Sequence, residues 1–325
     1  MLQKINVVPL AAESFGVRSM CTYVETPDLR ILIDPGVSLC PSRFQLPPHP
    51  KEFKAIINAR KRICEFASKA NVVSISHYHF DHHTPSFEDW LGNWTDSETA
   101  QQIYEDKLVL AKNPRININT SQRRRGWIFQ KTGGKHATKI QFADHKTFSF
   151  NNTKLNFSQP VPHGSPRTPL GFVLMTTIEY DDEKMMYTSD VQGPMATTTL
   201  ETILSEEPKL LIIGGPPTYL KGYRVTEQQI KHSLENLTTL TAKIPETILD
   251  HHILRDSEWQ DYTKEIIKSA QNLGNKVVTA AEYIGRKNQL LEAKREQIFK
   301  TFPPDPNFLK WASSDSNRRA KKPPL

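Results

Sequence analysis

The sequence predicts an α/β (α+β) fold in which helices cover the outer faces of two β-sheets. Short apolar segments separated by turn residues occupy the first 35 residues and return in the stretch 147–188. From residue 209 onward, apolar strands alternate with segments of helical spacing. A layered domain with helices outside two sheets buries the apolar faces of both kinds of segment. The 325 residues are enough for a well-buried core.

The first quarter of the chain predicts three antiparallel strands, a helix and a buried strand. Turn residues bound the strands at 5–10, 19–24 and 29–34, and Asp34-Pro35-Gly36 ends the third. The segment 51–69 carries Phe53, Ile56 and Ile63 on one helical stripe. The next segment, 71–76, is an apolar strand that leads directly into a histidine-rich run.

Residues 84–140 do not continue this pattern clearly. They contain three of the five tryptophans, a helical piece at 97–105 and a strongly basic run. We interpret this stretch as an insertion or lid over the site that the histidine-rich run forms.

The remaining segments predict strands and then alternating strands and helices. Strands are expected at 147–150, 155–160, 171–180, 184–188, 209–213, 246–250 and 276–280. Helices are expected at 227–243, where Thr226 is a suitable N-cap, and at 257–273 and 281–300. We therefore predict a single domain over residues 1–300, followed by an extended or disordered basic tail over 301–325.

Composition indicates a globular protein with no membrane-spanning segment. Hydrophobic residues make up 37% of the chain and charged residues 24%. No run approaches the roughly 20 apolar residues that a membrane span needs, and the apolar part of the N-terminus is short for a signal peptide. Three cysteines without a CxxC pair suit a reducing compartment. We expect a cytoplasmic protein with no membrane partner; the sequence does not indicate an oligomeric state.

The strongest chemical signal is the run His77-x-His79-x-Asp81-His82, which follows the apolar strand at 71–76. Two imidazoles spaced two residues apart in an extended segment point the same way. Imidazole and carboxylate together suit zinc, and also iron or manganese. A structural zinc site commonly includes cysteine, which this run lacks, so the run predicts an open catalytic centre.

A run of this form at the end of a strand resembles the signature of the metallo-β-lactamase superfamily. The order of further motifs also resembles it: Asp34 after an early strand, His163 in Val161-Pro162-His163-Gly164, Asp190 after Met186-Tyr187-Thr188-Ser189, and the pair His251 and His252 after Leu249-Asp250. The closest resemblance is to an uncharacterised, mostly archaeal group of predicted metal-dependent hydrolases. It implies an αββα sandwich over roughly residues 5–285.

The resemblance also implies a ligand set for two divalent metal ions, most readily zinc. One ion would be held by His77, His79 and His163, and the other by Asp81, His82 and either His251 or His252, with Asp190 bridging. Adjacent residues on a strand point to opposite sides, so we expect one ligand from the pair. Asp81 is the candidate catalytic residue, Asp250 a candidate to orient a ligand imidazole, and His83 a neighbour of the site. We expect the other four histidines, including His49, at the surface.

The substrate is less well defined. Arg123, Arg124 and Arg125 lie in a basic run with amide, hydroxyl and aromatic neighbours, which suits contact with phosphate or nucleic acid but also a solvated basic face. The net charge of +7 weakly favours anionic partners. Three functions remain open: hydrolysis of a small anionic ester, lactone or phosphodiester; a nuclease acting on RNA or DNA; and a nucleic-acid-binding protein with a non-catalytic metal site.

Overall fold

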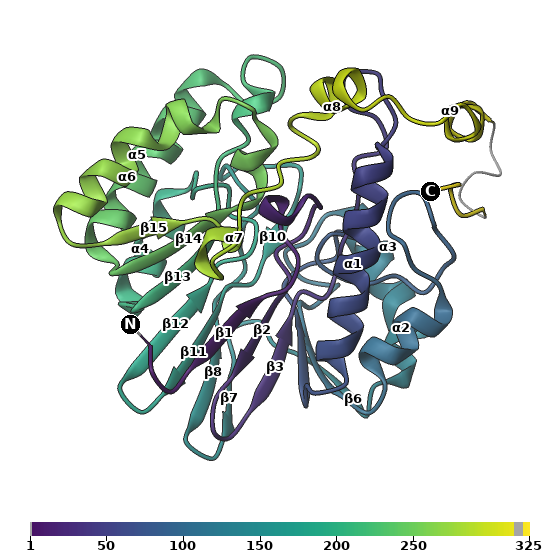
Figure 1. Ribbon diagram of the computed structural model, residues 1–325. Helices are drawn as coiled ribbons and strands as arrows, with labels where there is room; N and C mark the ends of the chain where they lie inside the picture. Colours follow the sequence, from purple (N-terminus) through teal and green to yellow (C-terminus); the bar gives the residue numbers. More distant parts are fainter. Residues whose placement is uncertain (1, 315–320) are drawn as a thin grey trace.

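The computed structural model describes residues 2–314 and 321–325. Two β-sheets pack against each other in the middle of the molecule. Helices α1, α2 and α3 lie on one side of this sandwich, and α4, α5 and α6 lie on the other (Figure 1). The layers are therefore helix, sheet, sheet and helix, which confirms the predicted αββα class.

The first sheet has six strands in the order β1-β2-β3-β4-β5-β6. The first three strands are antiparallel neighbours, and β4, β5 and β6 continue the sheet in parallel with β3. The strands are β1 (Asn6–Pro9), β2 (Thr22–Glu25), β3 (Arg30–Ile33), β4 (Val72–Ile75), β5 (Leu108–Ala111) and β6 (Lys139–Phe142).

The second sheet has seven strands in the order β15-β14-β13-β12-β11-β8-β7. It also combines an antiparallel part with a parallel part, which begins where β12 pairs with β13. The strands are β7 (Thr147–Phe150), β8 (Thr153–Phe157), β11 (Thr176–Tyr180), β12 (Glu183–Tyr187), β13 (Leu210–Gly214), β14 (Glu246–Asp250) and β15 (Lys276–Val278). A short pair, β9 (Val161–Pro162) and β10 (Phe172–Val173), lies outside both sheets.

Helices cover the outer faces, and shorter helical segments connect strands near the site. The α-helices are α1 (Pro50–Ala67), α2 (Ser97–Tyr104), α3 (Thr120–Lys131), α4 (Thr197–Glu206), α5 (Glu227–Lys243), α6 (Trp259–Asn272), α7 (Ala280–Tyr283), α8 (Arg295–Thr301) and α9 (Pro306–Ser313). The 3₁₀ segments are η1 (Glu13–Phe15), η2 (Gly133–His136), η3 (Thr218–Leu220) and η4 (His251–Arg255). Thr226 and Gln229 form a capping box that begins α5 where the sequence predicts it.

The alternation of side chains along the central strands explains the layers. In β3, Ile31 and Ile33 pack between the two sheets, whereas Leu32 packs against the helices of the first sheet. In β13, Leu210 and Ile212 face the other sheet, whereas Leu211 and Ile213 face α4, α5 and α6. Strands buried on both faces read as continuous apolar runs, which is why these segments stand out in the sequence.

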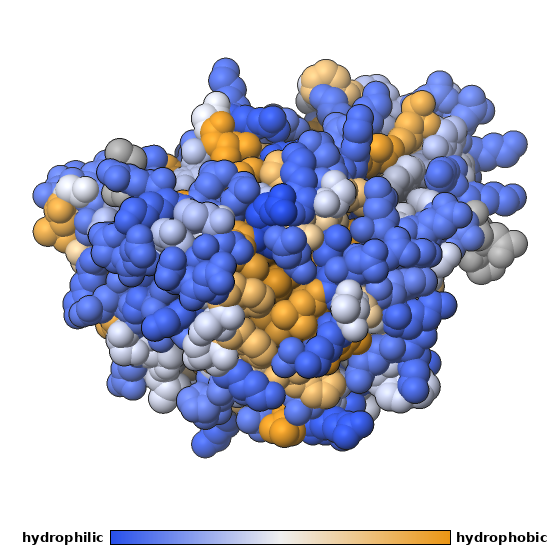
Figure 2. Space-filling model, turned by 90° about the horizontal axis from the view of Figure 1, so that it is seen from below, coloured by the Kyte–Doolittle hydropathy of each residue, from blue (hydrophilic) through white to orange (hydrophobic). Residues whose placement is uncertain are grey.

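One end of the sandwich carries the hairpin turns. Phe150 and Tyr180 end β7 and β11 at such turns and pack, partly buried, against the core between the sheets. Seen from below, the surface shows apolar side chains gathered in the middle of a hydrophilic surround (Figure 2). The opposite ends of the parallel strands carry the histidine-rich run and are described below.

The segment 84–140 was wrongly interpreted as an insertion or lid. It supplies β5 and β6, which extend the first sheet beyond β4, and α2 and α3, which cover that sheet. The segment is therefore part of the layered fold. Its strands were missed because they are only four residues long and are separated by a strongly basic helix.

The C-terminal expectations also need correction. The predicted helix over 281–300 is two short helices, α7 and α8, because Gly285 adopts φ +71 and the following residues cross back toward the first sheet. On this path Glu292 pairs with Arg18, and Arg295 pairs with Glu52. The tail includes helix α9, whose Phe308 is buried, while residues 321–325 lack regular structure and 315–320 lie outside the described residues. Within the described residues, no helix is long and apolar enough to cross a membrane.

Candidate metal centre

The site residues come from strand ends in both sheets. His77 follows β4, Asp190 follows β12 after a short link, and His251 follows β14 directly. His163 follows the short strand β9. Because parallel strands end at the same edge of a sheet, these residues converge at the mouth between the two sheets. The carboxyl ends of parallel strands are the usual place for ligand sites in such sheets.

The loop after β4 folds tightly around its own histidines. The backbone N–H groups of His82 and His83 both donate to the carbonyl oxygen of His79, at 3.0 Å. Gly36 lies directly against this turn, because a Cβ atom there would lie 2.4 Å from the backbone nitrogens of His82 and His83. The glycine of Asp34-Pro35-Gly36 is therefore required by close approach of the metal-site loop.

Four of the predicted ligands form a first group. The ligand atoms of His77, His79, His163 and Asp190 all lie within 4.8 Å of one another. Nε2 of His163 is 3.2 Å from Nδ1 of His79 and 3.0 Å from Oδ2 of Asp190. The structure thus brings together the three histidines that the resemblance assigns to one ion and the aspartate that it assigns to the bridging position.

Asp81, His82 and His251 form a second group of the same compactness. Nε2 of His251 is 3.9 Å from Oδ2 of Asp81 and 3.4 Å from Oδ2 of Asp190. Asp190 therefore stands between the two groups, as a carboxylate shared by two ions must.

The histidine nitrogens are poised for a ligand that the protein itself does not supply. Nε2 of His77 and Nε2 of His82 are buried without a hydrogen-bond partner, as is Oδ1 of Asp190. A buried polar atom without a partner costs free energy unless something binds it. Unpaired imidazole nitrogens and a carboxylate that face one space suit zinc-class ions. The side chains present therefore fit a metal centre.

The protonation states of His77, His79 and Asp190 in the first group also suit metal binding. Burial lowers the pKa of His79 to about 3, and the neighbouring imidazole of His163 acts in the same direction. Burial and the ring of His82 hold the pKa of His77 well below its usual range. Burial alone would raise the pKa of Asp190, but the imidazoles around it hold that pKa well below its usual range. Neutral imidazoles and ionised carboxylates are the forms that bind metal ions.

Asp34 positions His82 from behind. Its Oδ2 accepts hydrogen bonds from Nδ1 of His82 and from the Tyr187 hydroxyl, each at 2.8 Å, while Oδ1 accepts one from the backbone N–H of Ser76 at 2.7 Å. With Nδ1 committed to Asp34, His82 presents Nε2 to the centre. Such a carboxylate behind a ligand imidazole fixes the tautomer and the ring orientation.

Glu13 performs the same task for His251, and no pattern in the sequence indicates this role. Oε2 of Glu13 lies 3.0 Å from Nδ1 of His251, although 238 residues separate the two. Its other oxygen pairs with the buried guanidinium of Arg255 at 2.6 Å, and that guanidinium lies 3.4 Å from Asp81. Burial lowers the pKa of His251, but the carboxylates of Glu13 and Asp190 together outweigh burial and raise it to about 10.

The expectation that Asp250 orients an imidazole was wrong. Its carboxylate accepts hydrogen bonds from three backbone N–H groups, those of Ser14, His251 and Ala280. Asp250 therefore ties η1, η4 and α7 together at the end of β14. The imidazole of His251 is instead oriented by Glu13, the residue directly before Ser14.

The expectation that His251 and His252 point to opposite sides was also wrong. The two residues begin η4, with φ +64 at His251, so they no longer follow strand alternation. Their rings stack at 4.5 Å, and both Nε2 atoms lie within 3.4 Å of Oδ2 of Asp190. His251 alone of the two also belongs to the group with Asp81 and His82. The geometry favours His251 as the ligand and places His252 beside it.

The other histidines separate as follows. His83 turns away from the centre: its Nδ1 binds the carbonyl oxygen of His79, and its ring contacts Tyr78 and Phe129. His49, expected at the surface, is instead 3% exposed, because it caps α1 and contacts the carbonyl oxygen of Phe302.

Of the three arginines of α3, only Arg125 approaches the metal-site loop, where its guanidinium contacts the carbonyl oxygen of Tyr78 at 3.4 Å. Arg123 and Arg124 are exposed on the helix, and Arg125 lies over the ring of Phe80 at 4.4 Å. A cavity of about 390 Å³ opens onto the centre, and none of these three lines it. Its wall includes His79, Asp81, His163, Asp190, His252, Pro217, Tyr219 and the arginines Arg18, Arg224 and Arg255. Arg18, Arg224 and Arg255 could not be recognised from the sequence, because each stands alone in a different part of the chain.

We expect Gly36→Ala to distort the centre. The added methyl group would overlap the backbone of residues 81–83, so the loop must shift. Overpacking of this kind costs about 1–3 kcal/mol of unfolding free energy, and the displaced ligands should lower metal affinity. Denaturant unfolding and metal titration measure both effects. Gly274→Ala is the control, because nothing lies within 4 Å of a Cβ atom at Gly274, so this change adds only the backbone strain of its φ of +80 and should leave metal affinity unchanged.

The fold and the site define a protein of the metallo-β-lactamase fold. Two mixed sheets face each other between helical layers, and a His-x-His-x-Asp-His loop at a strand end meets His163, Asp190 and His251 from later strand ends. Within this class, the chain belongs to the UPF0282 family. It is 45% identical over 294 residues to the UPF0282 protein of Methanopyrus kandleri, which covers 90% of this chain and 99% of that one. It is 42% identical to the UPF0282 protein of Methanocaldococcus jannaschii over 90% of this chain and 96% of that one.

Solved structures share the backbone arrangement only distantly. The metallo-β-lactamase fold protein YhfI from Bacillus subtilis is 14% identical, with a TM-score of 0.49, and the match covers 88% of this chain and 98% of that chain. Zn²⁺-bound PqqB from Methylobacterium extorquens is 11% identical, with a TM-score of 0.48, over 84% and 97% of the two chains. A scan against protein-family models gave no match.

Proposed function

We propose that the chain is a metal-dependent hydrolase whose two divalent ions, zinc by preference, act on a small anionic ester, lactone or phosphodiester. The observation that carries this proposal is the convergence of seven imidazole and carboxylate side chains in two groups, which Asp190 links through its contact with His251. Within the described residues, several of the buried ligand nitrogens have no hydrogen-bond partner. Iron and manganese accept the same ligand types. We keep the cytoplasm as the expected location.

In this proposal His77, His79 and His163 would hold one ion, and Asp81, His82 and His251 would hold the other, with Asp190 available to both. When bound, such a centre would supply a water of lowered pKa and positive charge to stabilise the substrate. Asp34 and Glu13 hold the imidazoles of His82 and His251 in place.

Asp81 is the proposed catalytic residue among the ligands. Its side chain is 17% exposed and lines the cavity, whereas Asp190 is 2% exposed. A carboxylate that reaches the cavity can orient a water molecule or accept its proton, provided that the substrate lies beside it. The imidazoles of His82 and His251, and then the guanidinium of Arg255 at 3.4 Å, hold the pKa of Asp81 well below its usual range against the effect of burial.

The volume of the cavity favours a small-molecule substrate over the nucleic-acid substrate of the nuclease alternative. A volume of about 390 Å³ lies within the usual range of small-molecule sites, roughly 300–1,000 Å³. Support for nucleic acid rests on Arg123 and Arg124, which are exposed but do not line the cavity. Salt-dependent binding of oligonucleotides, lost in the double variant R123Q/R124Q, would favour the nucleic-acid-binding alternatives.

We expect chelation to abolish turnover and added zinc to restore it. Zinc-loaded protein is assayed against bis-p-nitrophenyl phosphate, a thioester and a lactone, before and after treatment with a chelator. Turnover of at least one compound should fall to background and return on addition of zinc, because the serines that contact His77, Ser76 and Ser189, are buried and do not line the cavity. Turnover that persists in fully metal-free protein would contradict the proposal.

A further inference from the structure

Three arginines line the cavity, and they differ in how completely the protein neutralises them. Arg18 comes from the loop after η1, Arg224 from the turn before α5, and Arg255 from η4. These segments are far apart in the sequence, so the fold has gathered the charges at one wall. A substrate that enters the cavity meets the metal centre on one side and these guanidinium groups on another.

The guanidinium of Arg255 is already paired with carboxylates of the protein. Its Nε and Nη2 both bind Glu13, at 2.7 and 2.6 Å, and its Nη2 also reaches Asp81 at 3.4 Å. Its side chain is 4% exposed. This arginine holds the side chains behind the centre and is not available to a substrate.

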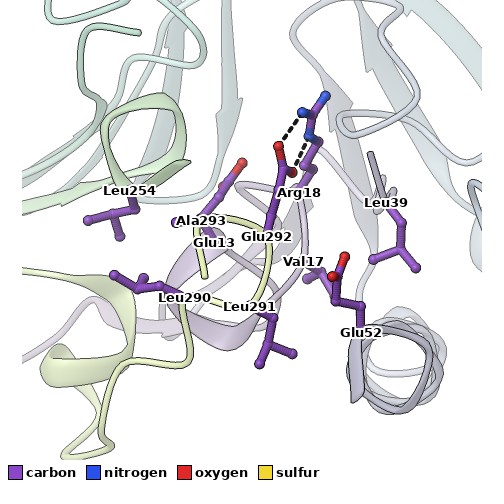
Figure 3. Close-up of a pocket in the computed structure, with 11 residues that line it drawn as sticks. Glu13, Val17, Arg18, Leu39, Glu52, Leu254, Leu290, Leu291, Glu292 and Ala293 are labelled. Carbon is purple, nitrogen blue, oxygen red and sulfur yellow. Dashed lines mark hydrogen bonds and ion pairs between the residues drawn. The ribbon is translucent and has the colours of Figure 1, made fainter. Parts of the chain in front are cut away.

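Arg18 is held in place by Glu292, which binds two of its three guanidinium nitrogens. Nε and Nη2 bind the two carboxylate oxygens of Glu292, at 2.6 and 2.5 Å. Figure 3 shows the two side chains pointing toward each other, joined by both interactions. Among the described residues, no hydrogen-bond partner is found for the third nitrogen, Nη1. A paired arginine with one free edge is a rigid donor with little orientational entropy to lose on binding.

Arg224 carries a charge that nothing in the described part of the chain neutralises. Its backbone is anchored, because its N–H donates to the carbonyl oxygen of Leu220 at 3.0 Å. The backbones of Lys221 and Val225, on either side of it, also form an isolated β-bridge. Its guanidinium is exposed and has no carboxylate within ion-pair distance among the described residues. The only contact found there is with the ring of Tyr223, at 5.5 Å.

We propose that Arg224 and the free edge of Arg18 form an anion-binding site in the cavity wall, which binds a terminal carboxylate or phosphate group of the substrate. This rests on the proposed function and narrows it to a substrate class. The hydrolysed ester, lactone or phosphodiester lies at the metal centre, and a second anionic group of the same small molecule reaches Arg224. Arginine suits this task because its fork of N–H groups matches both carboxylate and phosphate oxygens.

The first test uses paired inert probes. Zinc-loaded protein is titrated calorimetrically with propylphosphonate and with 2-carboxyethylphosphonate, which has a similar chain length but ends in a carboxylate. Homologues with one or two more methylene groups cover the span, and the bisphosphonates of equal length test phosphate in place of carboxylate. We expect a doubly anionic probe to bind about tenfold more tightly or better, as one or two charge-assisted hydrogen bonds allow.

The second test locates this preference. Arg224→Gln should remove most of it and leave the affinity for propylphosphonate unchanged, because the phosphonate lies at the metals. Arg123→Gln is the matched control, since Arg123 is exposed on α3 and does not line the cavity. Arg224 is exposed and makes no ion pair within the described residues, so its replacement should leave thermal unfolding unchanged.

The outcomes separate this site from the proposed function. Equal affinity for both probes at every chain length, or no binding of either, overturns the anion site. A preference that survives in Arg224→Gln, or falls equally in Arg123→Gln, overturns it as well. A preference that depends on Arg224, combined with no turnover of any compound in the hydrolysis panel, leaves the anion site standing and contradicts hydrolysis.

Discussion

Replacement of Asp190 by alanine is expected to remove most of the bound metal and to lower turnover by more than 100-fold. Asp190 belongs to the first ligand group, and its Oδ2 lies within 3.4 Å of Nε2 of His163, His251 and His252. It belongs to the first group and contacts His251 of the second, and both ligand groups should therefore be affected by its loss. Loss of residues that merely support ligands already costs about 10–100-fold in affinity or activity, so loss of the shared carboxylate should cost more.

The matched control is Asp182→Ala at the hairpin end of the molecule. Asp182 is 77% exposed and pairs there with Lys209, and exposed pairs contribute little stability. Elemental analysis and the hydrolysis panel are applied to both variants, and circular dichroism verifies that each is folded. Asp190→Ala protein with full metal content and full turnover would show that the centre has been placed wrongly.

The second large effect is expected for Glu13→Ala. Glu13 is 4% exposed, and its removal leaves the buried guanidinium of Arg255 with only its longer, 3.4 Å contact with Asp81. It also removes the acceptor for Nδ1 of His251. Breaking a buried ion pair from one side costs about 3–5 kcal/mol of unfolding free energy. Loss of the group that orients a ligand imidazole should also weaken metal binding by about 10–100-fold.

Glu13→Gln separates the two roles. The amide oxygen can still accept a hydrogen bond from one partner, so metal affinity should fall less than in Glu13→Ala, while the charge that balances Arg255 is lost in both. Glu201→Ala on the exposed face of α4 is the control. Metal affinity is measured by competition with a chromogenic chelator, and stability by denaturant unfolding. Wild-type metal affinity in Glu13→Ala would show that His251 needs no partner behind it.

The sequence predicted the parts of the fold that depend on local patterns. Strands such as Ile31–Ile33 and Leu210–Ile213 are buried on both faces, so their apolar runs are conspicuous, and Thr226 marks the start of α5. Strands β5 and β6 were not recognised, because their short segments take their place only through pairing with β4 and with each other. The C-terminal path over 284–294 is likewise set by long-range ion pairs, which no local pattern reveals.

The candidate site shows the same division. His77, His79, Asp81 and His82 lie within six residues, and the later ligand candidates end recognisable strands, so their convergence could be predicted. Glu13 and Arg18 could not, because each acts through a partner more than 200 residues away, and neither lies in a chemical motif. Sequence proximity also misled: the conspicuous arginines of α3 lie outside the cavity, whereas single arginines from three distant loops line it.

We propose that this chain holds two metal ions in one shared centre. The most direct test is elemental analysis of the wild-type protein after reconstitution with excess zinc and removal of loosely bound metal. We expect close to two equivalents of zinc per chain, falling well below one in Asp190→Ala. A wild-type protein that retains no tightly bound metal, or that retains the same amount after Asp190 is replaced, would contradict the account.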